Sequence, residues 1–448
     1  MTAAQTSAPV AKTAAPAAKT NVPAADRTIE CDITIVGCGV AGLYAALNLP
    51  RDLRIVMLSK EAVDHCDSML AQGGICVMRD HNDYGSWFDD TMRAGHYECR
   101  PESVDTMIWD SREVINDLVR LGVDFDRTPS GDFDYTREGA HSRNRIIHHK
   151  DITGKAITTE LLMQVRRLAN VHILEQTVME DLLIEGGEEG RGEDERAGAA
   201  GVEDERAAAG ADSPATEHCA GILARDNAGT LAIRSRDTLL ATGGVGGLYE
   251  HSTNFRCLTG DGCRICERHG IQLDHMDYVQ IHPTTLYTTK PGRSFLISES
   301  CRGEGAILLD AHGERFTDEL QPRDVVSQAI FSQMRKDGTR HVWLSFERVS
   351  RQVIRDHFAN IHRHCLQEGY DITCEPIPVV PAQHYLMGGI HVDQHSATTM
   401  PHLYAAGETS CNGVHGKNRL ASNSLLESLV FARLAARDIV RRRHGWTR

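Results

Sequence analysis

The chain has 448 residues, of which 41% are hydrophobic and 25% are charged, and its formal net charge is -14. This composition is ordinary for a globular protein of two or three domains. The acidic balance argues against a nucleic-acid scaffold, and the lack of an apolar run near the roughly 20 residues that cross a bilayer argues against a membrane protein.

Thirteen cysteines occur without a secretory signal ahead of them. This usage favours reduced thiols, and we expect a soluble, cytoplasmic protein.

Two segments have compositions that cannot bury a core. Residues 1–27 are mainly Ala, Thr, Pro and Lys, and we expect a disordered tail rather than an Arg-rich transit peptide. Residues 186–217 are mainly Gly, Glu, Ala, Arg and Asp, and they separate the strand-like runs Val178–Ile184 and Cys219–Ala224. We therefore predict a solvated insertion across a hairpin.

The remaining chain alternates strand-like with helix-like runs, which favours an α/β architecture. The short β-branched runs Ile33–Val36 and Arg54–Leu58 suit a buried parallel sheet. Apolar spacing predicts helices over Ser103–Leu121, Gly154–Ala169 and Ser424–Arg442, and the arginines that end the last run are favourable at a helix C-terminus.

A glycine motif follows the first strand and opens the helical run Ala41–Leu49. It consists of Gly37, Cys38, Gly39, Val40, Ala41 and Gly42. In this pattern the first glycine permits a tight turn, the second lets the backbone approach a diphosphate, and the third allows helix and strand to pack closely. The exposed N–H groups at the helix start then hold the anion, so the motif predicts a dinucleotide site.

Other segments extend and modify this prediction. The acidic residue expected after the second strand is replaced by Ser59 and Lys60. Either these side chains bind the ribose and phosphates, or the site binds a ligand other than NAD. Two more strand-to-glycine turns, Thr238–Gly244 and Leu403–Glu408, stand far along the chain. A ligand that needs strand ends so far apart in sequence is long, as FAD is.

Several further motifs occur in one order along the chain. They are Ala71–Gly74, Arg137–Gly139, His282–Thr284, Arg302–Gly305, Pro322–Val326 and His384–Tyr385. Together they resemble the flavoproteins of the succinate dehydrogenase and fumarate reductase superfamily. The segments Thr136–Ser142 and His415–Glu427 resemble the L-aspartate oxidase family within it, and the resemblance covers about residues 30–442.

The resemblance implies a Rossmann-like FAD-binding domain interrupted by an α+β capping domain. We expect a tail at 1–27, the first part of the FAD-binding domain at 28–275, the capping domain at 276–385 and the second part of the FAD-binding domain at 386–448. The family usually continues into a C-terminal helical bundle, which we expect to be absent because the sequence stops at Arg448.

The resemblance also implies the residues that contact FAD. Besides the glycine motif they are Ser59, Lys60, Asp67, Ser68, Met69, Leu70, Ala71, Gln72, Gly73, Gly74, Thr242, Gly243, Asp261, Glu408, Ser424 and Leu425. Asp67 stands where the membrane-complex members carry the histidine that bonds covalently to FAD. We therefore expect non-covalent FAD, and His65 is the one nearby residue that could upset this expectation.

A dicarboxylate substrate needs fixed cations and hydrogen-bond donors. By resemblance, the catalytic residues are Arg323, His282, His384 and Arg419, and the substrate-binding residues are Glu138, Thr284, Ser298 and Glu299. Glu138 would face the α-amino group, and Arg323 would serve as the acid/base residue.

The reaction implied is oxidation of L-aspartate to iminoaspartate, the first step of de novo NAD (quinolinate) biosynthesis. Dioxygen or fumarate would reoxidise the FAD, other C4 dicarboxylates would also bind, and quinolinate synthase would act downstream. One alternative is a soluble fumarate reductase or succinate dehydrogenase flavoprotein subunit, against which Asp67, Glu138 and the run Asn418–Asn423 speak. An alternative of another class is an FAD-binding structural protein without turnover.

The pair Cys263 and Cys266 has the C-x-x-C spacing of some redox and metal sites. No second cysteine pair follows at zinc or cluster spacing, so we predict no metal site.

Overall fold

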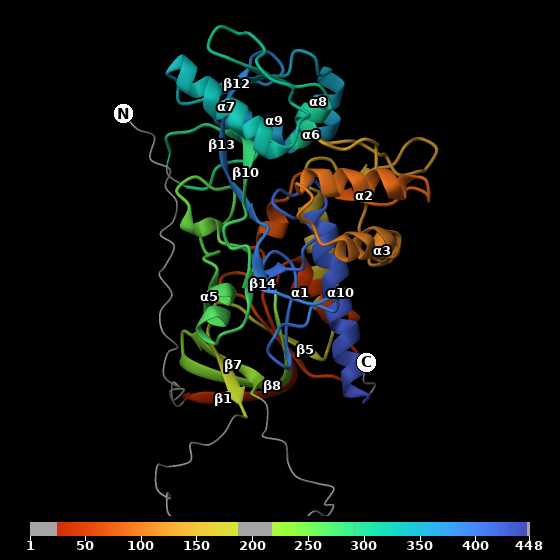
Figure 1. The fold of residues 1–448 in the computed structure, drawn as a ribbon, viewed down its shortest axis with the longest axis vertical. Helices are drawn as coiled ribbons and strands as arrows, with labels where there is room; N and C mark the ends of the chain where they lie inside the picture. The colour runs from red at the N-terminus through yellow and green to blue at the C-terminus, as the bar shows by residue number, and fades with distance from the viewer. Residues whose placement is uncertain (1–24, 187–216, 291, 446–448) are drawn as a thin grey trace, which may run out of the picture.

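The computed structural model describes residues 25–186, 217–290 and 292–445. Figure 1 shows an elongated molecule with one sheet at the bottom of the view and a second group of strands and helices at the top. We call the lower part the first unit and the upper part the second unit. Among the described residues, no helix is both long and apolar enough to cross a membrane.

The first unit is built on a seven-stranded sheet. Its main path runs in the order β5 (Val171–Leu174), β2 (Ile55–Leu58), β1 (Arg27–Val36), β8 (Gly229–Leu240), β7 (His218–Asp226) and β6 (Val178–Glu185), and β15 (Leu403–Ala405) also pairs with β8. The pairs from β5 to β8 and the pair of β15 with β8 are parallel, whereas β8, β7 and β6 are antiparallel.

Both faces of this sheet are covered. Ile33 and Ile35 enter a core with α1 (Val40–Asn48), α3 (Pro101–Arg120), α4 (Thr153–Val165) and α10 (Ser424–Arg443), whereas Val36 enters a core on the opposite face with α5 (Asp261–Arg268). Successive side chains in a strand point to opposite faces, so a sheet covered on both sides needs apolar residues at every position. The prediction of a buried parallel sheet is therefore confirmed.

The second unit has its own sheet and its own core. The sheet has the order β10 (Val279–Leu286), β13 (Ile377–Leu386), β12 (Val342–Ser345) and β11 (Ile307–Leu309), and its pairs are antiparallel. Four helices accompany it: α6 (Glu299–Gly303), α7 (Arg323–Asp337), α8 (Arg351–His357) and α9 (Ala359–Gln367). The helix α7 packs on this sheet, and the fully buried Ile330, Leu344 and Ile361 belong to its core.

Short elements lie around and between the two units. They are α2 (Asp83–Ala94), β3 (Ile75–Cys76), β4 (Ile146–Ile147), β9 (Leu273–Asp274), β14 (Gly389–His391), β16 (Ser410–Cys411), and the 3-10 turns Asp67–Leu70 and Gly246–Leu248.

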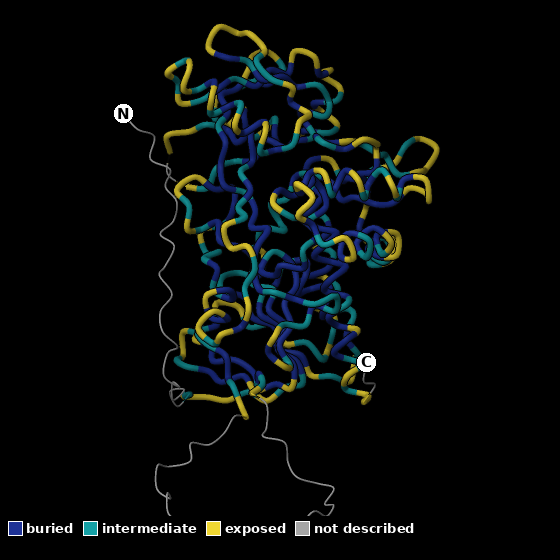
Figure 2. Tube along the Cα trace, in the orientation of Figure 1, coloured by how far each residue is buried: buried dark blue, intermediate teal, exposed yellow. Residues whose placement is uncertain are grey.

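The carboxylate of Asp151, just before α4, accepts the N–H groups of Ile361 at 2.6 Å and Asn360 at 3.2 Å. A side chain of the first unit thus caps α9 of the second. Figure 2 shows mostly buried and half-buried chain where the units meet.

The predicted elements appear with small shifts at their ends. The helices α1, α3, α4 and α10 confirm the helical runs, although α4 ends at Val165 rather than Ala169. The first strand begins at Arg27, earlier than predicted, because Arg27–Cys31 pair with Leu231–Ser235 of β8. The strands β6 and β7 confirm the hairpin, whereas the predicted insertion at 186–217 and the predicted tail lie almost entirely outside the described residues.

Candidate active site

A long cavity lies between the carboxyl ends of the parallel strands and the second unit. About 1710 Å³ of space free of protein atoms lies in and around it, including open solvent at its mouth. Val36 of β1, Leu58 of β2, Ala241 after β8 and Ala406 after β15 line one side of it. In doubly wound folds, ligands bind at this edge of a parallel sheet.

The glycine motif forms the turn between β1 and α1. Gly37 has φ +116°, and a Cβ there would stand 2.0 Å from the carbonyl oxygen of Ala241. A Cβ on Gly42 would stand 2.1 Å from the carbonyl oxygen of Gly37. Both positions exclude any side chain, so the turn and the close approach of α1 to the sheet require glycine.

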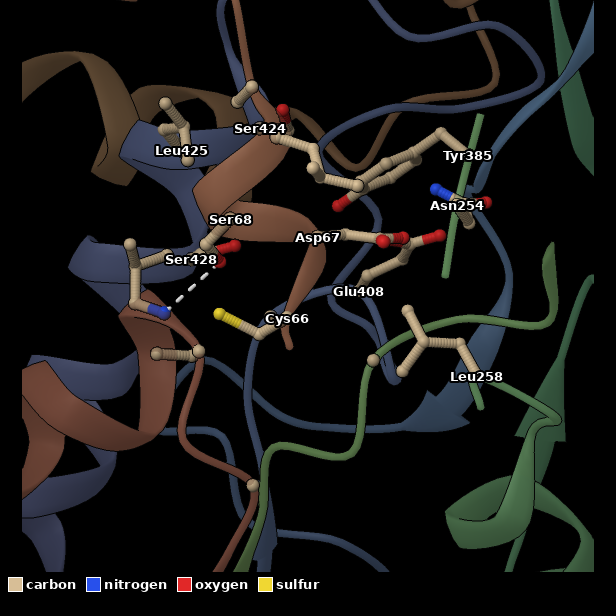
Figure 3. Close-up of a pocket in the computed structure, with 18 of the residues that line it drawn as sticks. Cys66, Asp67, Ser68, Asn254, Leu258, Tyr385, Glu408, Ser424, Leu425 and Ser428 are labelled. Atoms are coloured by element: carbon tan, nitrogen blue, oxygen red, sulfur yellow. Dashed lines mark hydrogen bonds between the residues drawn. The ribbon is translucent and has the colours of Figure 1, made fainter. Parts of the chain in front are cut away.

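The start of α1 opens toward the cavity. Gly39 is its N-cap with no side-chain cap hydrogen bond, and no acidic residue stands in the first turn. Ser68 Oγ accepts the N–H of Val40 at 3.2 Å (Figure 3). Unpaired N–H groups at a helix start favour an anion, so this end of the cavity fits the diphosphate of a dinucleotide.

Lys60 and Asp261 form an ion pair at the cavity wall. Nζ of Lys60 lies 2.7 Å from Oδ2 of Asp261 and also donates to the carbonyl of Cys257 at 2.9 Å. This pair lies beyond the end of β2, where dinucleotide sites of this class bind a ribose.

Asp67 and Glu408 point toward one another across the cavity (Figure 3). Oδ1 of Asp67 accepts the N–H of Phe255 at 2.9 Å, and Oε1 of Glu408 accepts the N–H of Leu386 at 3.0 Å. Burial raises the pKa of Asp67 to about 7, and burial together with the nearby Asp67 raises the pKa of Glu408 to about 8. Oδ2 of Asp67 is buried without a partner in the protein, so it is available to a polar ligand.

Two thiols also line this part of the cavity. The Sγ of Cys38 lies 3.5 Å from the carbonyl oxygen of Leu58, and Cys66 lies beside the 3-10 turn that begins at Asp67. Burial raises the pKa of both thiols to about 12.

Arg323 lies at the start of α7, at the end of the cavity that faces the second unit. Its Nε donates to Oε2 of Glu299 at 2.6 Å, and its Nη1 donates to Oε1 of Gln280 at 2.8 Å. Burial opposes ionisation of Glu299, but Arg323 and Arg302 outweigh it, so the pKa of Glu299 lies below its ordinary value. The guanidinium of Arg323 is thus held rigidly by an ionised carboxylate.

Arg419 is the second guanidinium of the cavity. Its Nη1 donates to Ser424 Oγ at 2.6 Å, its guanidinium lies over the ring of Tyr385, and its Nε is buried without a protein partner. Burial and the neighbouring Arg323 lower the pKa of Arg419 to about 10, so the side chain stays cationic at neutral pH. Two buried cations in one cavity suit a doubly negative ligand.

His282 and His384 lie against one another, with ring centroids 5.1 Å apart. Nδ1 of His282 accepts the N–H of Thr284 at 3.2 Å, and its Nε2 is buried without a partner. Nδ1 of His384 lies 2.7 Å from Thr253 Oγ1. Burial, followed by the nearby Arg323, lowers the pKa of both imidazoles, which are therefore neutral at physiological pH.

Glu138 is the remaining carboxylate at this end. Its two oxygens accept hydrogen bonds from Ser300 Oγ and Ser422 Oγ, each at 2.6 Å. Burial and the charge of Glu299 raise its pKa. A cation that enters the cavity would therefore favour the ionised form of Glu138.

The cavity brings together nearly all the residues predicted for the site. Of that set, only Gly42, Met69 and Thr284 are outside its lining. Gly42 acts through packing, and the Thr284 hydroxyl donates to the carbonyl of Ile297 at 2.9 Å, so this residue supports His282 from behind.

Other lining residues were not predicted. They include Glu61, Cys66, Thr177, Val178, Met179, Thr253, Asn254, Cys257, Leu258, Arg293, Leu296, Tyr385, Ser422 and Ser428. His65, named above as the residue that could overturn non-covalent binding of FAD, also lines the cavity. Tyr385 and Ser422 stand inside motifs that the sequence had pointed out, whereas Arg293 and Asn254 carry no local signal.

Comparisons with known proteins identify an FAD-binding family. The family described as FAD binding domain matches residues 32–425. An L-aspartate oxidase of Clostridium perfringens is 46% identical over 409 residues, which are 91% of this chain and 86% of that protein. An L-aspartate oxidase of Pseudomonas aeruginosa is 40% identical over 430 residues, which are 92% of this chain and 75% of that protein.

Solved structures of related flavoproteins have a similar fold. A quinol fumarate reductase of E. coli superposes with a TM-score of 0.82 at 29% sequence identity, over 94% of this chain and 72% of that chain. A Mycobacterium smegmatis Sdh1 structure superposes with a TM-score of 0.71 at 29% identity, over 93% of this chain and 69% of that chain.

Proposed function

The chain belongs to the L-aspartate oxidase family of FAD-binding proteins, and from this premise we propose that it oxidises L-aspartate to iminoaspartate in the first step of de novo NAD (quinolinate) biosynthesis. The observation that carries the proposal is the pairing, in one cavity, of a dinucleotide-type glycine turn with two buried guanidinium groups and a buried carboxylate.

We infer that FAD lies along the cavity from the Lys60 end to the second unit. The open start of α1 would hold the diphosphate, Lys60 and Asp261 would lie near the adenosine, and Asp67 and Glu408 would contact the middle of the cofactor. A carboxylate at Asp67 cannot replace a histidine as the covalent attachment point, so we propose that FAD is bound non-covalently.

The substrate carboxylates would be bound by Arg323 and Arg419, each of which keeps part of its guanidinium free of protein partners. His282, His384 and Ser298 would contact the remaining carboxylate oxygens, and Glu299 would hold Arg323 in place. Holding both ends of the substrate fixes the Cα–H bond, and orientation of this kind contributes about 7–11 kcal/mol in enzymes.

Oxidation removes a hydride from Cα and a proton from the α-ammonium group, and this proton would be released to solvent. When bound, FAD supplies the acceptor for the hydride and passes the electrons to dioxygen or fumarate. Glu138 would bind the α-ammonium group, because a buried carboxylate with a raised pKa gains from a cation beside it. With fumarate, Arg323 would hold the proton that is added to carbon, and its guanidinium is the acid/base group of the proposal.

The architecture supports a division of labour between the two units. We propose that residues 28–275 and 386–448 form the FAD-binding domain and that residues 276–385 form a capping domain over the substrate. Other C4 dicarboxylates would compete for the same cations, and quinolinate synthase would consume the product.

A second candidate is a fumarate reductase or succinate dehydrogenase flavoprotein subunit, favoured by the likeness to the E. coli quinol fumarate reductase. Anaerobic mixing distinguishes the two, with L-aspartate and succinate added separately while flavin absorbance is followed. We expect bleaching by L-aspartate and binding of succinate without bleaching. Bleaching by succinate alone would favour the second candidate, and a colourless protein that refuses added FAD would overturn both.

A further inference from the structure

Gln280 of β10 stands behind the cavity wall and contacts both guanidinium-bearing segments. Its side chain is buried at 3% exposure and does not line the cavity. Oε1 accepts from Arg323 Nη1 at 2.8 Å. Nε2 donates to the carbonyl oxygen of Arg419 at 2.8 Å and to Oδ1 of Asn418 at 2.9 Å. One amide therefore joins the start of α7 to the segment that carries Arg419.

The orientation of this amide is fixed by chemistry. A guanidinium only donates hydrogen bonds and a carbonyl oxygen only accepts them, so the oxygen of Gln280 must face Arg323 and its nitrogen must face Arg419. The hydrogen bonds continue beyond Asn418, whose Nδ2 donates to the carbonyl of Ala94 at 3.0 Å. Ala94 is the last residue of α2 and belongs to the core that α2 shares with the first unit, so the chain of hydrogen bonds runs from the second unit to the core of the first.

We propose that Gln280 is a positioning residue that sets the spacing between the Arg323 and Arg419 guanidinium groups. This inference rests on the function proposed above. A small dicarboxylate bound by two cations aims its Cα–H bond correctly only at one spacing of those cations, and a misplacement of about 1 Å can cost about 10²-fold in rate.

Few other side chains can fill this role. A methionine of similar size offers neither the acceptor for Arg323 nor the donors for Arg419 and Asn418. A glutamate offers acceptors alone. An asparagine has the same amide on a side chain that is shorter by one methylene, so it cannot reach both partners from the same backbone position.

The test compares Gln280→Met and Gln280→Asn with Gln333→Met in the FAD-loaded protein. Gln333 is a buried glutamine of α7 whose amide donates to Asp337 at 2.9 Å and to Asp310 at 3.4 Å, away from the cavity. The measurements are kcat and KM for L-aspartate, the succinate dissociation constant by calorimetry, bound FAD and the melting temperature. We expect both Gln280 variants to keep FAD, to lose about 10²-fold in kcat/KM and to bind succinate about 10-fold more weakly.

Gln333→Met should lower the melting temperature without lowering kcat/KM for L-aspartate and without weakening the binding of succinate. A double-mutant cycle with Arg323→Lys adds a second criterion, because a residue that acts through Arg323 has a smaller effect once Arg323 is changed. A folded Gln280→Asn with wild-type kcat/KM and succinate affinity would overturn the inference, as would full additivity in the cycle. If instead the wild-type protein is not bleached by L-aspartate, the proposed function fails and not the role of Gln280 alone.

Discussion

The guanidinium carbon of Arg419 lies 4.4 Å from the centroid of the Tyr385 ring. Both residues are buried, and the ring lies in β13 of the second unit while the arginine belongs to the loop before α10. A cation over an aromatic face is attracted by the ring quadrupole, and desolvation strengthens this attraction. Tyr385 therefore helps to keep Arg419 cationic and fixed while leaving its Nε unpaired.

Replacing this ring should weaken the binding of dicarboxylates. We expect Tyr385→Leu to raise the succinate dissociation constant by about 5- to 30-fold, which corresponds to the roughly 1–2 kcal/mol of a buried cation–π contact. Tyr385→Phe keeps the ring and should stay within about 2-fold of wild type. Arg419→Leu, measured by the same calorimetry, should abolish binding, and an unchanged affinity would remove Arg419 from the site.

Glu138 should make the site prefer a substrate with an amino group at Cα over one with a methylene there. We expect Glu138→Gln to raise KM for L-aspartate about 10-fold or more, because a charge-assisted hydrogen bond is worth about 1.5–3 kcal/mol. Succinate has no ammonium group, so its affinity should be unchanged or higher. Glu319→Gln, a change at a buried carboxylate outside the cavity, should leave both values alone. An equal weakening of L-aspartate and succinate binding in Glu138→Gln would contradict a contact between Glu138 and the amino group.

Gly37 should tolerate no side chain. In Gly37→Ala the new Cβ would meet the Ala241 carbonyl at 2.0 Å while the backbone keeps φ +116°, so we expect the protein to lose FAD and stability together. Gly85→Ala is the matched control, because Gly85 lies in α2 with nothing within 4 Å of its Cβ position. This change should stabilise the protein by up to about 1 kcal/mol in urea unfolding. Retention of FAD by Gly37→Ala would contradict the turn described above.

The stability of the FAD-free protein should depend on pH through Asp67. Its pKa of about 7 in the folded state is above the ordinary value of 3.8, so the folded protein binds a proton that the unfolded chain has released between these values. Stability therefore falls as pH rises from about 4 to about 7, by at most about 4 kcal/mol for this group. Urea unfolding at pH 5 and 8 should give a smaller fall for Asp67→Asn, whereas an identical fall would show that Asp67 is not the source.

Local signals allowed much of the fold to be predicted. The glycine turn and the parallel strands were predicted because their requirements act over a few residues: a positive φ at Gly37, and apolar side chains on both faces at Ile33 and Val36. The helices α6 to α9 were not predicted, because they are short and draw their stability from a separate core.

The site was predicted through motifs, and its supporting contacts were not. Arg323 and Arg419 were predicted as site residues. Gln280 joins them through hydrogen bonds that span 43 and 139 sequence positions, and sequence patterns relate only residues that are a few positions apart. Thr284 was assigned to the substrate from its place in a motif. Its hydroxyl donates to the Ile297 carbonyl, beside a register shift in the pairing of β10 with β13 that no local pattern indicates.

The thiols of Cys38 and Cys66 have a consequence for the durability of an oxidase. Transfer of electrons to dioxygen yields hydrogen peroxide, which attacks thiolates far faster than thiols. With a pKa of about 12, on the order of one in 10⁵ of either side chain is ionised at neutral pH. We expect both sulfurs to stay protonated and therefore to resist oxidation by the hydrogen peroxide that turnover with dioxygen would release.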